Sequence, residues 1–517
     1  MLLCRQSHRA ITGTTIPQLR SPRLKHTADH PPDQPSGHSL RKELGLRDLV
    51  PMQILLVVGI TWAGLAARQG SGHVLWWLLA ILMLFLPVAG VISYCVQIWP
   101  LEGGVYQWTK HAIGPFAGFL SAWNFGFWAL GAVAVVGIQT ATSLSYALGP
   151  RAAWMQNSHI LINSLSVGIF AVILLINIPG FGIGRWVSHF GTAVTVLITL
   201  LLAVLIFFHP HTSAAHPHTS PQRPFSLALP TVTLLTINLF SKLTFNALTG
   251  LEQVAVFAGE TRNAAKTILR SAWIGAPIIA VIFILMSGSM LTYIPADKID
   301  LTGPIPQVLA AAFSGGTASG ASASNAFNWG LMLGRTAIFV LAIALVAQFA
   351  VIVAETSRLP MVAAWDHLIP AWFTKLHPRY RTPTRSLAVI VTLAVLMCFF
   401  ASAGASAQEA YQLIATSANI SYAIYYLLMF TVPLVTGSRF GKPAGILLKL
   451  ACCSGIFITL LSIAFSLVPV VEVPSPWIFA LKVGLTALAV NLVGGAIYYR
   501  GNRLKLREEH TAALSAH

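Results

Sequence analysis

Two stretches of the sequence interrupt long apolar segments with glycine and small or polar residues. In the first, LLVVGITWAGLAARQG, Gly59 and Gly64 bracket small and polar side chains. In the second, NLFSKLTFNALTGLEQVAVFAG, Asn246, Thr249 and Gly250 lie near the middle. A helix that stops at such a point leaves backbone N–H or C=O groups unpaired, and these groups can bind a carboxylate or an ammonium group. The alternative is that the glycines only allow neighbouring helices to pack closely.

Ionisable side chains inside the apolar segments are the second set of candidates, because a charge at the centre of a membrane helix costs about 2.5–3.5 kcal/mol. Glu252 follows the second interruption, and it is either a proton acceptor or a structural group bound by backbone N–H donors. Lys242 either recognises an acidic ligand or replaces a bound cation, or it pairs with backbone carbonyl groups. Arg335 is expected to reach the outer interface, and Glu355 is expected to pair with loop residues at the cytoplasmic end.

Motifs of catalysis and of metal or cofactor binding are missing from the sequence. It contains no HExxH or GxSxG motif, no phosphate-binding glycine loop and no facing carboxylates. The five cysteines follow neither a metal-binding spacing nor a disulfide framework. We therefore expect that the protein is not an enzyme and that it uses neither a cofactor nor a metal.

The elements that must position these residues follow from the composition. Of the 517 residues, 56% are hydrophobic and 9% are charged, against about 25% charged in an ordinary soluble domain. A soluble globular protein is therefore excluded, and at about 20 residues per crossing the apolar residues suffice for about twelve helical spans. Twelve apolar segments are predicted, with eleven or thirteen as alternatives: 51–69, 73–98, 114–148, 159–179, 186–208, 230–258, 271–294, 330–356, 385–403, 408–435, 444–468 and 476–499.

Positive charge indicates the orientation of these spans. The 32 Lys and Arg residues exceed the 15 Asp and Glu residues, and the net charge is +17. Most of the basic residues lie in the N-terminal tail, in alternate loops and at the C-terminus, which is typical of cytoplasmic segments. We therefore expect both termini in the cytoplasm, a location in the plasma (cell inner) membrane, contact with the lipid bilayer and no nucleic-acid partner.

Three parts are expected along the chain: a disordered cytoplasmic tail over residues 1–50, a transmembrane domain over residues 51–499 and a cytoplasmic tail over residues 500–517. The external loop 209–229 contains HPHTS twice. We interpret it as an extended linker, with a histidine-rich metal or pH sensor as the alternative. The loop 295–329 includes GGTASGASASN, which is typical of a flexible connector.

Three stretches resemble the amino acid–polyamine–organocation (APC) superfamily of permeases. PLEGGVYQWTKHAIGPFAGFLSAW (100–123) is similar to the region of helices two and three, and FNALTGLEQVAVFAGETRNAAKTILRSAW (245–273) is similar to helix six and the loop after it. SRLPMVAAWDHLIPAWFTKLHPRYRTP (357–383) is similar to the loop after helix eight. The resemblance implies an all-α polytopic membrane protein with twelve transmembrane helices, arranged as a five-plus-five inverted repeat with helices 1 and 6 discontinuous, plus two additional helices.

The resemblance also implies that a small-molecule substrate binds at the two interruptions. On this sequence it assigns the site to Thr61, Trp62, Ala63 and Gly64 in helix one, Phe119 and Trp123 in helix three, Phe245, Asn246, Ala247, Thr249 and Gly250 in helix six, and Gln348 and Phe349 in helix eight. Glu252 matches a glutamate implicated in gating or proton linkage in some relatives. Lys242 remains a candidate charge partner.

The sequence departs from the family's pattern in helix one, where the ligand is expected, and in the loop after helix eight. The family commonly has a GSG-type triplet in helix one, whereas this sequence has GITWAGLAA with the bulky Trp62, so the resemblance does not assign the carboxylate site or the substrate. The loop after helix eight often has Arg-Asp-Gly in the family. This chain has Trp365, Asp366 and His367 there, which we expect to change gating contacts.

We therefore expect a secondary active permease for an amino acid or a related, polyamine-like amine. It would work by alternating access as a proton symporter or an exchanger, with Glu252 as the proton-coupling candidate. A membrane-embedded sensor of the same fold, which binds without transport, is the alternative from a different class. A channel would need a continuous polar lining, whereas these segments offer only a polar patch at mid-depth.

Overall fold

The computed structural model describes residues 42–208, 225, 227, 229, 232–313, 329–402, 407–437, 443–468 and 475–515. Residues 1–41, nearly all of the loop with the HPHTS repeat, and the GGTASGASASN connector lie outside the described residues. The first helix already begins at Leu46, upstream of the tail boundary expected at residue 50. At the other end, the last helix continues through the expected C-terminal tail to Ser515.

The described chain is built from helices, and its one β feature is an isolated bridge between Leu44 and Thr261. The α-helices are α1 Leu46–Val57, α2 Ile60–Ala67, α3 His73–Ala80, α4 Leu86–Ile98, α5 Val105–Ala112, α6 Pro115–Ala134, α7 Val136–Leu148, α8 His159–Asn177, α9 Phe181–Leu205, α10 Leu234–Ala247, α11 Ala264–Tyr293, α12 Pro304–Phe313, α13 Trp329–Thr356, α14 Arg358–Trp365, α15 Thr384–Ser402, α16 Ala407–Val435, α17 Ile446–Ser466 and α18 Pro476–Ser515. Short 3₁₀ or π turns are η1 Gly70–Gly72, η2 Ile81–Phe85, η3 Pro150–Gln156, η4 Ile206–Phe208, η5 Gln253–Glu260, η6 Ala296–Lys298 and η7 Ala371–Thr374.

Nine helical stretches of the described residues are long and apolar enough to cross a membrane. They are Gly70–Ile98, Pro115–Leu148, His159–Asn177, Ile183–Leu205, Ala264–Tyr293, Trp329–Ala364, Leu413–Val435, Ile446–Ser466 and Pro476–Arg507. The prediction of an all-helical, multi-pass membrane protein is thereby confirmed. The count of twelve and the five-plus-five repeat stay predictions.

The three remaining predicted segments do not form a long, continuous apolar helix. Segment 385–403 contains the shorter apolar helix Thr384–Phe399. Segments 51–69 and 230–258 do not form continuous helices, because each is interrupted within its length. These are the two segments in which the sequence predicts an interruption.

The first interruption separates α1 from α2 at Val58 and Gly59. Val58 has φ −76° and ψ 88°, and Gly59 is extended at φ −87° and ψ 129°. The Gly59 N–H donates to the Val57 carbonyl group at 2.8 Å, so the chain turns within three residues. A Cβ at Gly59 would lie 2.4 Å from the Trp62 ring, so glycine allows that ring to pack against the backbone.

The second interruption is longer and covers residues 248–252, between α10 and the 3₁₀ helix η5. Gly250 has φ +110°, a conformation that residues with a side chain rarely adopt. A Cβ there would also lie 3.3 Å from Val57, the last residue of α1. The two interruptions are therefore in contact with each other, although they are far apart in the sequence.

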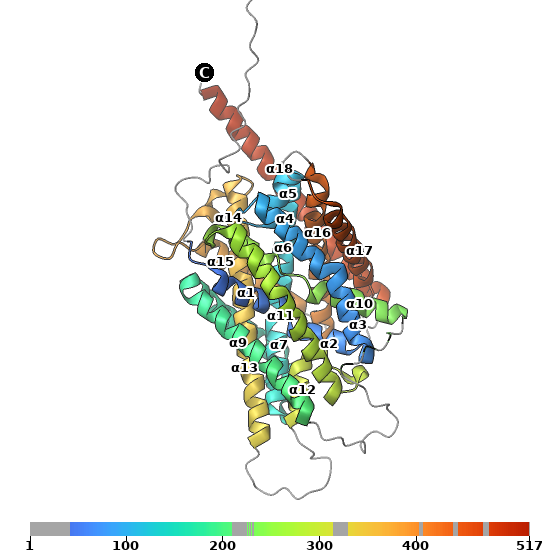
Figure 1. Ribbon diagram of the computed structural model, residues 1–517. Coiled ribbons are helices and arrows are strands. Elements are labelled where there is room, and N and C mark those ends of the chain that lie inside the picture. The colour runs from blue at the N-terminus through green and yellow to red at the C-terminus, as the bar shows by residue number, and fades with distance from the viewer. Residues whose placement is uncertain are drawn as a thin grey trace, which may run out of the picture. The chain divides into compact units, whose positions relative to one another are not determined.

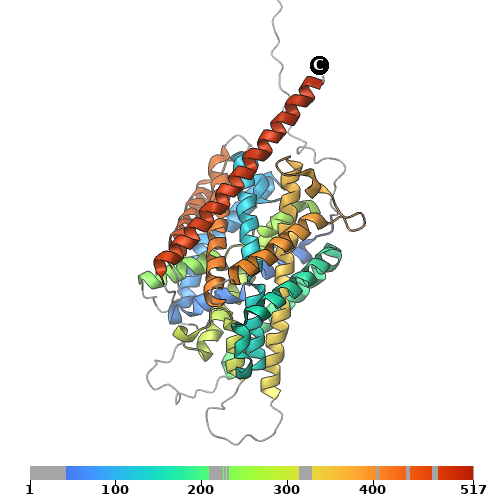
Figure 2. The ribbon, with the colours of Figure 1, turned by 180° about the vertical axis from the view of Figure 1, so that it is seen from behind.

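Packing between distant helices fixes the position of the two interruptions. α1 packs against α9, α11 and η5, while α10 packs against α2 and α17. Among the helices without an interruption, α6 packs against α16, and α13 packs against α7 and α9. Figure 1 shows these helices gathered around the interrupted segments, and Figure 2 shows the red α18 running along the outside of the bundle, where it contacts α16 and α6.

Candidate functional site

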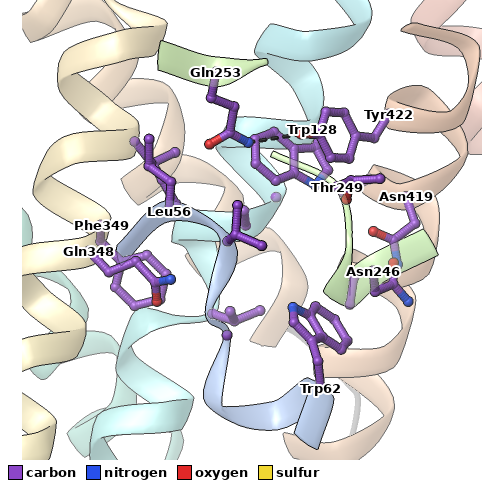
Figure 3. Close-up of a pocket in the computed structure, with 18 of the residues that line it drawn as sticks. Leu56, Trp62, Trp128, Asn246, Thr249, Gln253, Gln348, Phe349, Asn419 and Tyr422 are labelled. Carbon is purple, nitrogen blue, oxygen red and sulfur yellow. Dashed lines mark hydrogen bonds between the residues drawn. The ribbon is translucent and has the colours of Figure 1, made fainter. Parts of the chain in front are cut away.

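A cavity of about 100 Å³ lies between the two interruptions and three neighbouring helical segments. Figure 3 shows Gln348 and Phe349 on one side of the cavity, and Asn246 and Asn419 on the other. The lining residues come from α1 and α2, from α6 and α7, from α10 to η5, from α13 and from α16: Leu56, Val57, Gly59, Trp62, Trp128, Gly131, Ala132, Val135, Gln139, Asn246, Thr249, Gln253, Leu345, Gln348, Phe349, Ile352, Ala415, Ala418, Asn419 and Tyr422.

The polar side chains around the cavity are neutral, and none of the described lining residues is charged. Three amide oxygen atoms of this set, Gln139 Oε1, Asn246 Oδ1 and Gln253 Oε1, are buried and have no hydrogen-bond partner among the described residues. A buried acceptor without a donor is costly, by about 1–3 kcal/mol per group. The cavity therefore suits a ligand that brings N–H donors, such as an ammonium group.

Aromatic rings supply much of the remaining surface. Trp128 stacks on Tyr422 with 4.0 Å between ring centroids, and Trp62 and Phe349 also line the cavity. Such rings bury the apolar part of a small ligand, and their faces attract a cation.

Gln348 donates hydrogen bonds to the backbone at the end of α1, next to the first interruption. Its Nε2 donates to the Leu55 carbonyl group at 2.5 Å and to the Val58 carbonyl group at 3.3 Å. These are backbone acceptors that the end of α1 would otherwise leave unpaired. A neutral side-chain amide therefore occupies the position in which free carbonyl groups could bind a cation.

Glu252 organises the second interruption. Its Oε2 accepts hydrogen bonds from the Gly250 N–H at 3.1 Å and from the Tyr426 hydroxyl, and its Oε1 accepts from the Tyr422 hydroxyl at 2.7 Å. Gln253 Nε2 also donates to the Tyr422 hydroxyl at 2.9 Å. Glu252 is fully buried, and it lies behind Tyr422 rather than in the cavity wall.

Five of the residues predicted for the site line the cavity: Trp62, Asn246, Thr249, Gln348 and Phe349. Five others, Ala63, Gly64, Phe245, Ala247 and Gly250, lie in the same interrupted segments outside the cavity wall. Of these, Phe245 packs edge-on against Tyr422 and Tyr426. Thr61 lies in α2, and its side chain is outside the described residues.

Phe119 and Trp123 lie elsewhere, on the first half of α6. Phe119 packs in a small cluster with Leu368 and Tyr498, and Trp123 Nε1 donates to the Val490 carbonyl group at 2.8 Å. Both side chains therefore contact α18 or the loop after α14 and do not line the cavity. The α6 residues that do so lie further along the helix, from Trp128 to Ala132.

Among the polar and aromatic residues of the cavity wall, five were missed from the sequence: Trp128, Gln139, Gln253, Asn419 and Tyr422. Gln139, Gln253 and Asn419 are uncharged polar residues inside apolar segments, and this is the property by which they could have been found. Trp128 and Tyr422 carry no comparable feature, since aromatic residues are common in apolar helices.

The structure also shows the surroundings of the ionisable side chains Lys242, Arg335 and Glu355. Lys242 Nζ donates to the Val468 carbonyl group at 2.6 Å and lies outside the cavity wall, so the structure shows the pairing with a backbone carbonyl group. Arg335 lines a second cavity of about 450 Å³. The loop partner expected for Glu355 is not found, because neither of its carboxyl oxygens has a hydrogen-bond partner within the described chain.

Charged residues gather where η5 meets the loops after α4 and α13. Arg358 Nε donates to Glu260 Oε1 at 2.9 Å, and the Gly259 N–H donates to Glu102 Oε2 at 2.5 Å. Burial raises the pKa of the Glu102 carboxyl well above its usual range, and the charge of Glu260 raises this pKa further.

A second ion pair lies close by in sequence. Lys110 of α5 pairs with Asp366 at 2.5 Å, and Asp366 also accepts a hydrogen bond from the Tyr106 hydroxyl. Asp366 belongs to the Trp-Asp-His triplet in which the sequence departs from the family's pattern. The charged groups thus connect α14 and the residue that follows it to α5 and to the end of η5.

A helical membrane protein with two touching helix interruptions, a small neutral cavity between them and charged loop contacts at one end has the construction of a carrier for small solutes. Comparison with known proteins agrees with this class. Residues 49–489 match the family described as amino acid permease. The chain belongs to this family, within the APC superfamily, and it is a membrane transporter.

The relatives differ in the substrates that their names give. The chain is 23% identical over 416 residues to an uncharacterized transporter of Legionella pneumophila, covering 79% of this chain and 83% of the relative. It is 26% identical over 379 residues to the low-affinity putrescine importer PlaP of Escherichia coli, covering 70% and 75% of the two chains. It is 22% identical over 378 residues to the branched-chain amino acid permease BcaP of Bacillus subtilis, covering 69% and 75%.

Proposed function

We propose that the protein is a secondary active permease that moves an amino acid or a related amine across the plasma membrane by alternating access. The observation that carries this proposal is the cavity of about 100 Å³ between the two interruptions, because three of the side chains that line it have a buried amide oxygen without a hydrogen-bond partner among the described residues. In this proposal twelve helices cross the membrane as a five-plus-five inverted repeat with two more, and both termini are cytoplasmic. Transport is a proton symport or an exchange, and the sequence names Glu252 as the group that links it to protons.

The neutral lining favours one of the two kinds of substrate named among the relatives. An amino acid zwitterion carries both charges and is neutral overall. Putrescine carries two positive charges, and the described cavity wall offers no carboxylate to balance them. Burying an uncompensated charge costs several kcal/mol, so we expect amino acids to be preferred over putrescine. Trp62, Trp128 and Phe349 would then enclose the apolar side chain of the substrate.

Counterflow in proteoliposomes tests this proposal. Vesicles loaded with an unlabelled amino acid or with putrescine are diluted into the labelled compound, and saturable, trans-stimulated uptake identifies a carrier. Binding without flux would instead identify a sensor, and flux that does not saturate would identify a channel. Either result would contradict the proposal.

A matched pair of variants on α10 tests the position of the site. Asn238 and Asn246 are both asparagines of α10 with a buried Oδ1 that lacks a partner in the described chain, and only Asn246 lines the cavity. Asn246→Leu is expected to raise the KM for the substrate about tenfold or more, which corresponds to about 1.4 kcal/mol of lost binding. Asn238→Leu is expected to leave the KM unchanged, and equal effects of the two variants would place the site elsewhere.

A further inference from the structure

Glu252 and Glu355 are two buried carboxyl groups with opposite surroundings. Both side chains have an exposed fraction of 0%. Glu252 accepts hydrogen bonds from two tyrosine hydroxyls and one backbone N–H. Glu355, in the last turn of α13, has no hydrogen-bond partner for either oxygen among the described residues.

The cation nearest in sequence to Glu355 is already engaged by other groups. Arg358 pairs with Glu260 at 2.9 Å through Nε, and its Nη1 donates to the Ala354 carbonyl group at 2.5 Å and to Ser357 Oγ at 3.2 Å. The guanidinium group also lies 5.2 Å from the ring centroid of Phe257. Arg358 therefore contributes its field to Glu355 but no hydrogen bond.

The other ionisable groups that act on Glu355 come from two packed segments. Glu252, from the interruption after α10, is close enough for the two carboxyl charges to repel each other. Tyr425, from α16, is a buried phenol that interacts electrostatically with both carboxyl groups. Two carboxylates that share a dry region are not ionised together, because the second charge is opposed by the first and by the loss of water.

Hydrogen bonds decide which of the two carboxyl groups is neutral. An ionised carboxylate is stabilised by donors, and Glu252 has three. A carboxylate without donors in a dry region would carry the full cost of lost hydration, and Glu355 is in this position. We propose that Glu355 is a proton-binding site, protonated in the conformation described here, and that Glu355, in place of the sequence candidate Glu252, binds and releases the proton that drives transport. In this assignment Glu252 stays ionised and maintains the second interruption.

The proposed step transfers one proton and no electrons. When the bundle opens at the end where α13 meets α14, water reaches the last turn of α13. The O–H bond of the Glu355 carboxyl then breaks, and the proton passes to water. The carboxylate that remains is then stabilised by water and by the field of Arg358, three residues further along the chain. The assignment rests on the proposed carrier function, because a group that changes its protonation once per cycle requires a cycle.

Infrared spectroscopy of the purified full-length protein tests the protonation state without any transport. A protonated carboxyl group has a C=O stretching band that a carboxylate lacks. The difference between wild type and Glu355→Gln at neutral pH should contain this band, and the difference between wild type and Glu252→Gln should not. The reverse result, or no band in either difference, would overturn the assignment. A contribution from Glu102 is present in all three proteins and cancels.

A proton gradient in proteoliposomes tests the coupling. For one proton per substrate, a gradient of one pH unit should raise substrate accumulation by the wild type about tenfold. Glu355→Gln should reduce this ratio to about one while keeping trans-stimulated exchange, because glutamine imitates the protonated acid. Glu355→Asp, which keeps a titratable group, should restore part of the gradient dependence.

The outcomes separate this inference from the proposed function. A wild type with no flux of any amino acid or amine would contradict the permease and leave the infrared result standing. A wild type with exchange but no response to the gradient would contradict proton coupling at Glu355. If Glu355→Gln is not recovered as folded protein, the shift of the infrared band in Glu355→Asp replaces its loss as the readout, and an unshifted band would reject Glu355.

Discussion

The two helix interruptions have opposite chemistry. At the first, backbone carbonyl groups of α1 accept hydrogen bonds from the neutral amide of Gln348. At the second, the Gly250 N–H and two tyrosine hydroxyls donate to the carboxyl group of Glu252. The carbonyl groups at the first interruption thus receive their donor from a side chain of another helix, Gln348 of α13. The N–H group at the second interruption finds its acceptor in a side chain of the same segment, Glu252.

This difference indicates how a binding site can remain neutral although it is built from helix ends. A bare helix end carries a partial charge of about half an elementary unit, which attracts ions of opposite sign. Here the end of α1 and the backbone before η5 each pair with a fixed side chain, and the buried acceptors without a partner among the described lining residues are the amide oxygens of Gln139, Asn246 and Gln253. In the proposed permease, specificity then depends on side-chain amides and not only on the backbone.

The largest effect is expected from removing the two neutralising side chains in turn. Glu252→Leu leaves one N–H and two hydroxyl groups without their carboxylate acceptor, and hydrogen bonds to charged groups contribute about 1.5–3 kcal/mol each. Gln348→Leu leaves two carbonyl groups without an amide donor, at about 1 kcal/mol each. We expect the free energy of unfolding to fall by about 5 kcal/mol or more in the first variant and about 2 kcal/mol in the second.

Thermal unfolding of both variants in the same detergent measures this order. Thr392→Val, which removes an exposed hydroxyl of α15 that bonds within its own helix, is the control for the loss of a hydrogen bond away from both interruptions. Equal losses at Glu252 and Gln348, or a larger loss at Gln348, would show that the two interruptions are stabilised alike.

The glycines of the two interruptions should differ in the property that they affect. Gly250→Ala forces a side chain into φ +110°, which costs about 1–3 kcal/mol of folding free energy. Gly59→Ala keeps an ordinary φ of −87°, and its Cβ displaces only the Trp62 ring. We expect a lower thermal midpoint for Gly250→Ala, and an unchanged midpoint with a raised substrate KM for Gly59→Ala. A matching drop in both midpoints would contradict the distinction.

The interruptions were predictable from sequence because their cause is local. Gly59 lies two residues before Thr61, and Gly250 directly follows Thr249, inside segments that are mostly apolar, and a helix is weakest at such glycines. The all-helical class followed from composition for the same reason, since each span needs only enough apolar residues in a row. Local sequence was therefore enough for the long apolar helices and for the two interruptions.

The cavity wall was only partly predictable because it depends on the rotation and depth of distant helices. Phe119, Trp128 and Gln139 belong to one continuous apolar segment, and packing against α16 and α18 decides which of them faces the cavity. The bond between Gln348 and Leu55 joins residues 293 positions apart. No local pattern contains that information, and the same holds for the missing partner of Glu355.

A smaller effect is expected at Glu102, which accepts a hydrogen bond from Gly259 at the far end of η5. The pKa of the Glu102 carboxyl is raised in the folded protein, whereas the pKa of a glutamate in the unfolded chain is about 4.3. The folded state therefore keeps a proton that the unfolded state loses, so stability falls as the pH rises above the unfolded value. The slope is at most about 1.4 kcal/mol per pH unit and ends at the folded pKa.

Thermal midpoints recorded between pH 5 and pH 8 measure this slope. Glu102→Gln should flatten the decline, while Glu43→Gln, at a half-buried position that touches the same segment through its backbone, should keep it. An unchanged slope in Glu102→Gln would mean that this carboxyl group is ionised in the folded state.

The smallest effect is expected at Lys242, on the same helix as the second interruption but outside the cavity wall. Its ammonium group donates to the Val468 carbonyl group, so it supports the contact between α10 and the end of α17 rather than a ligand. Lys242→Met should lower uptake of neutral, acidic and cationic substrates by the same factor, about twofold to threefold, as expected for a contact of about 0.5 kcal/mol. Lys449→Met, at an exposed position of α17, is the control. A selective loss for acidic amino acids would instead mean that Lys242 reaches the substrate in another conformation, and that the second interruption is not neutral throughout the cycle.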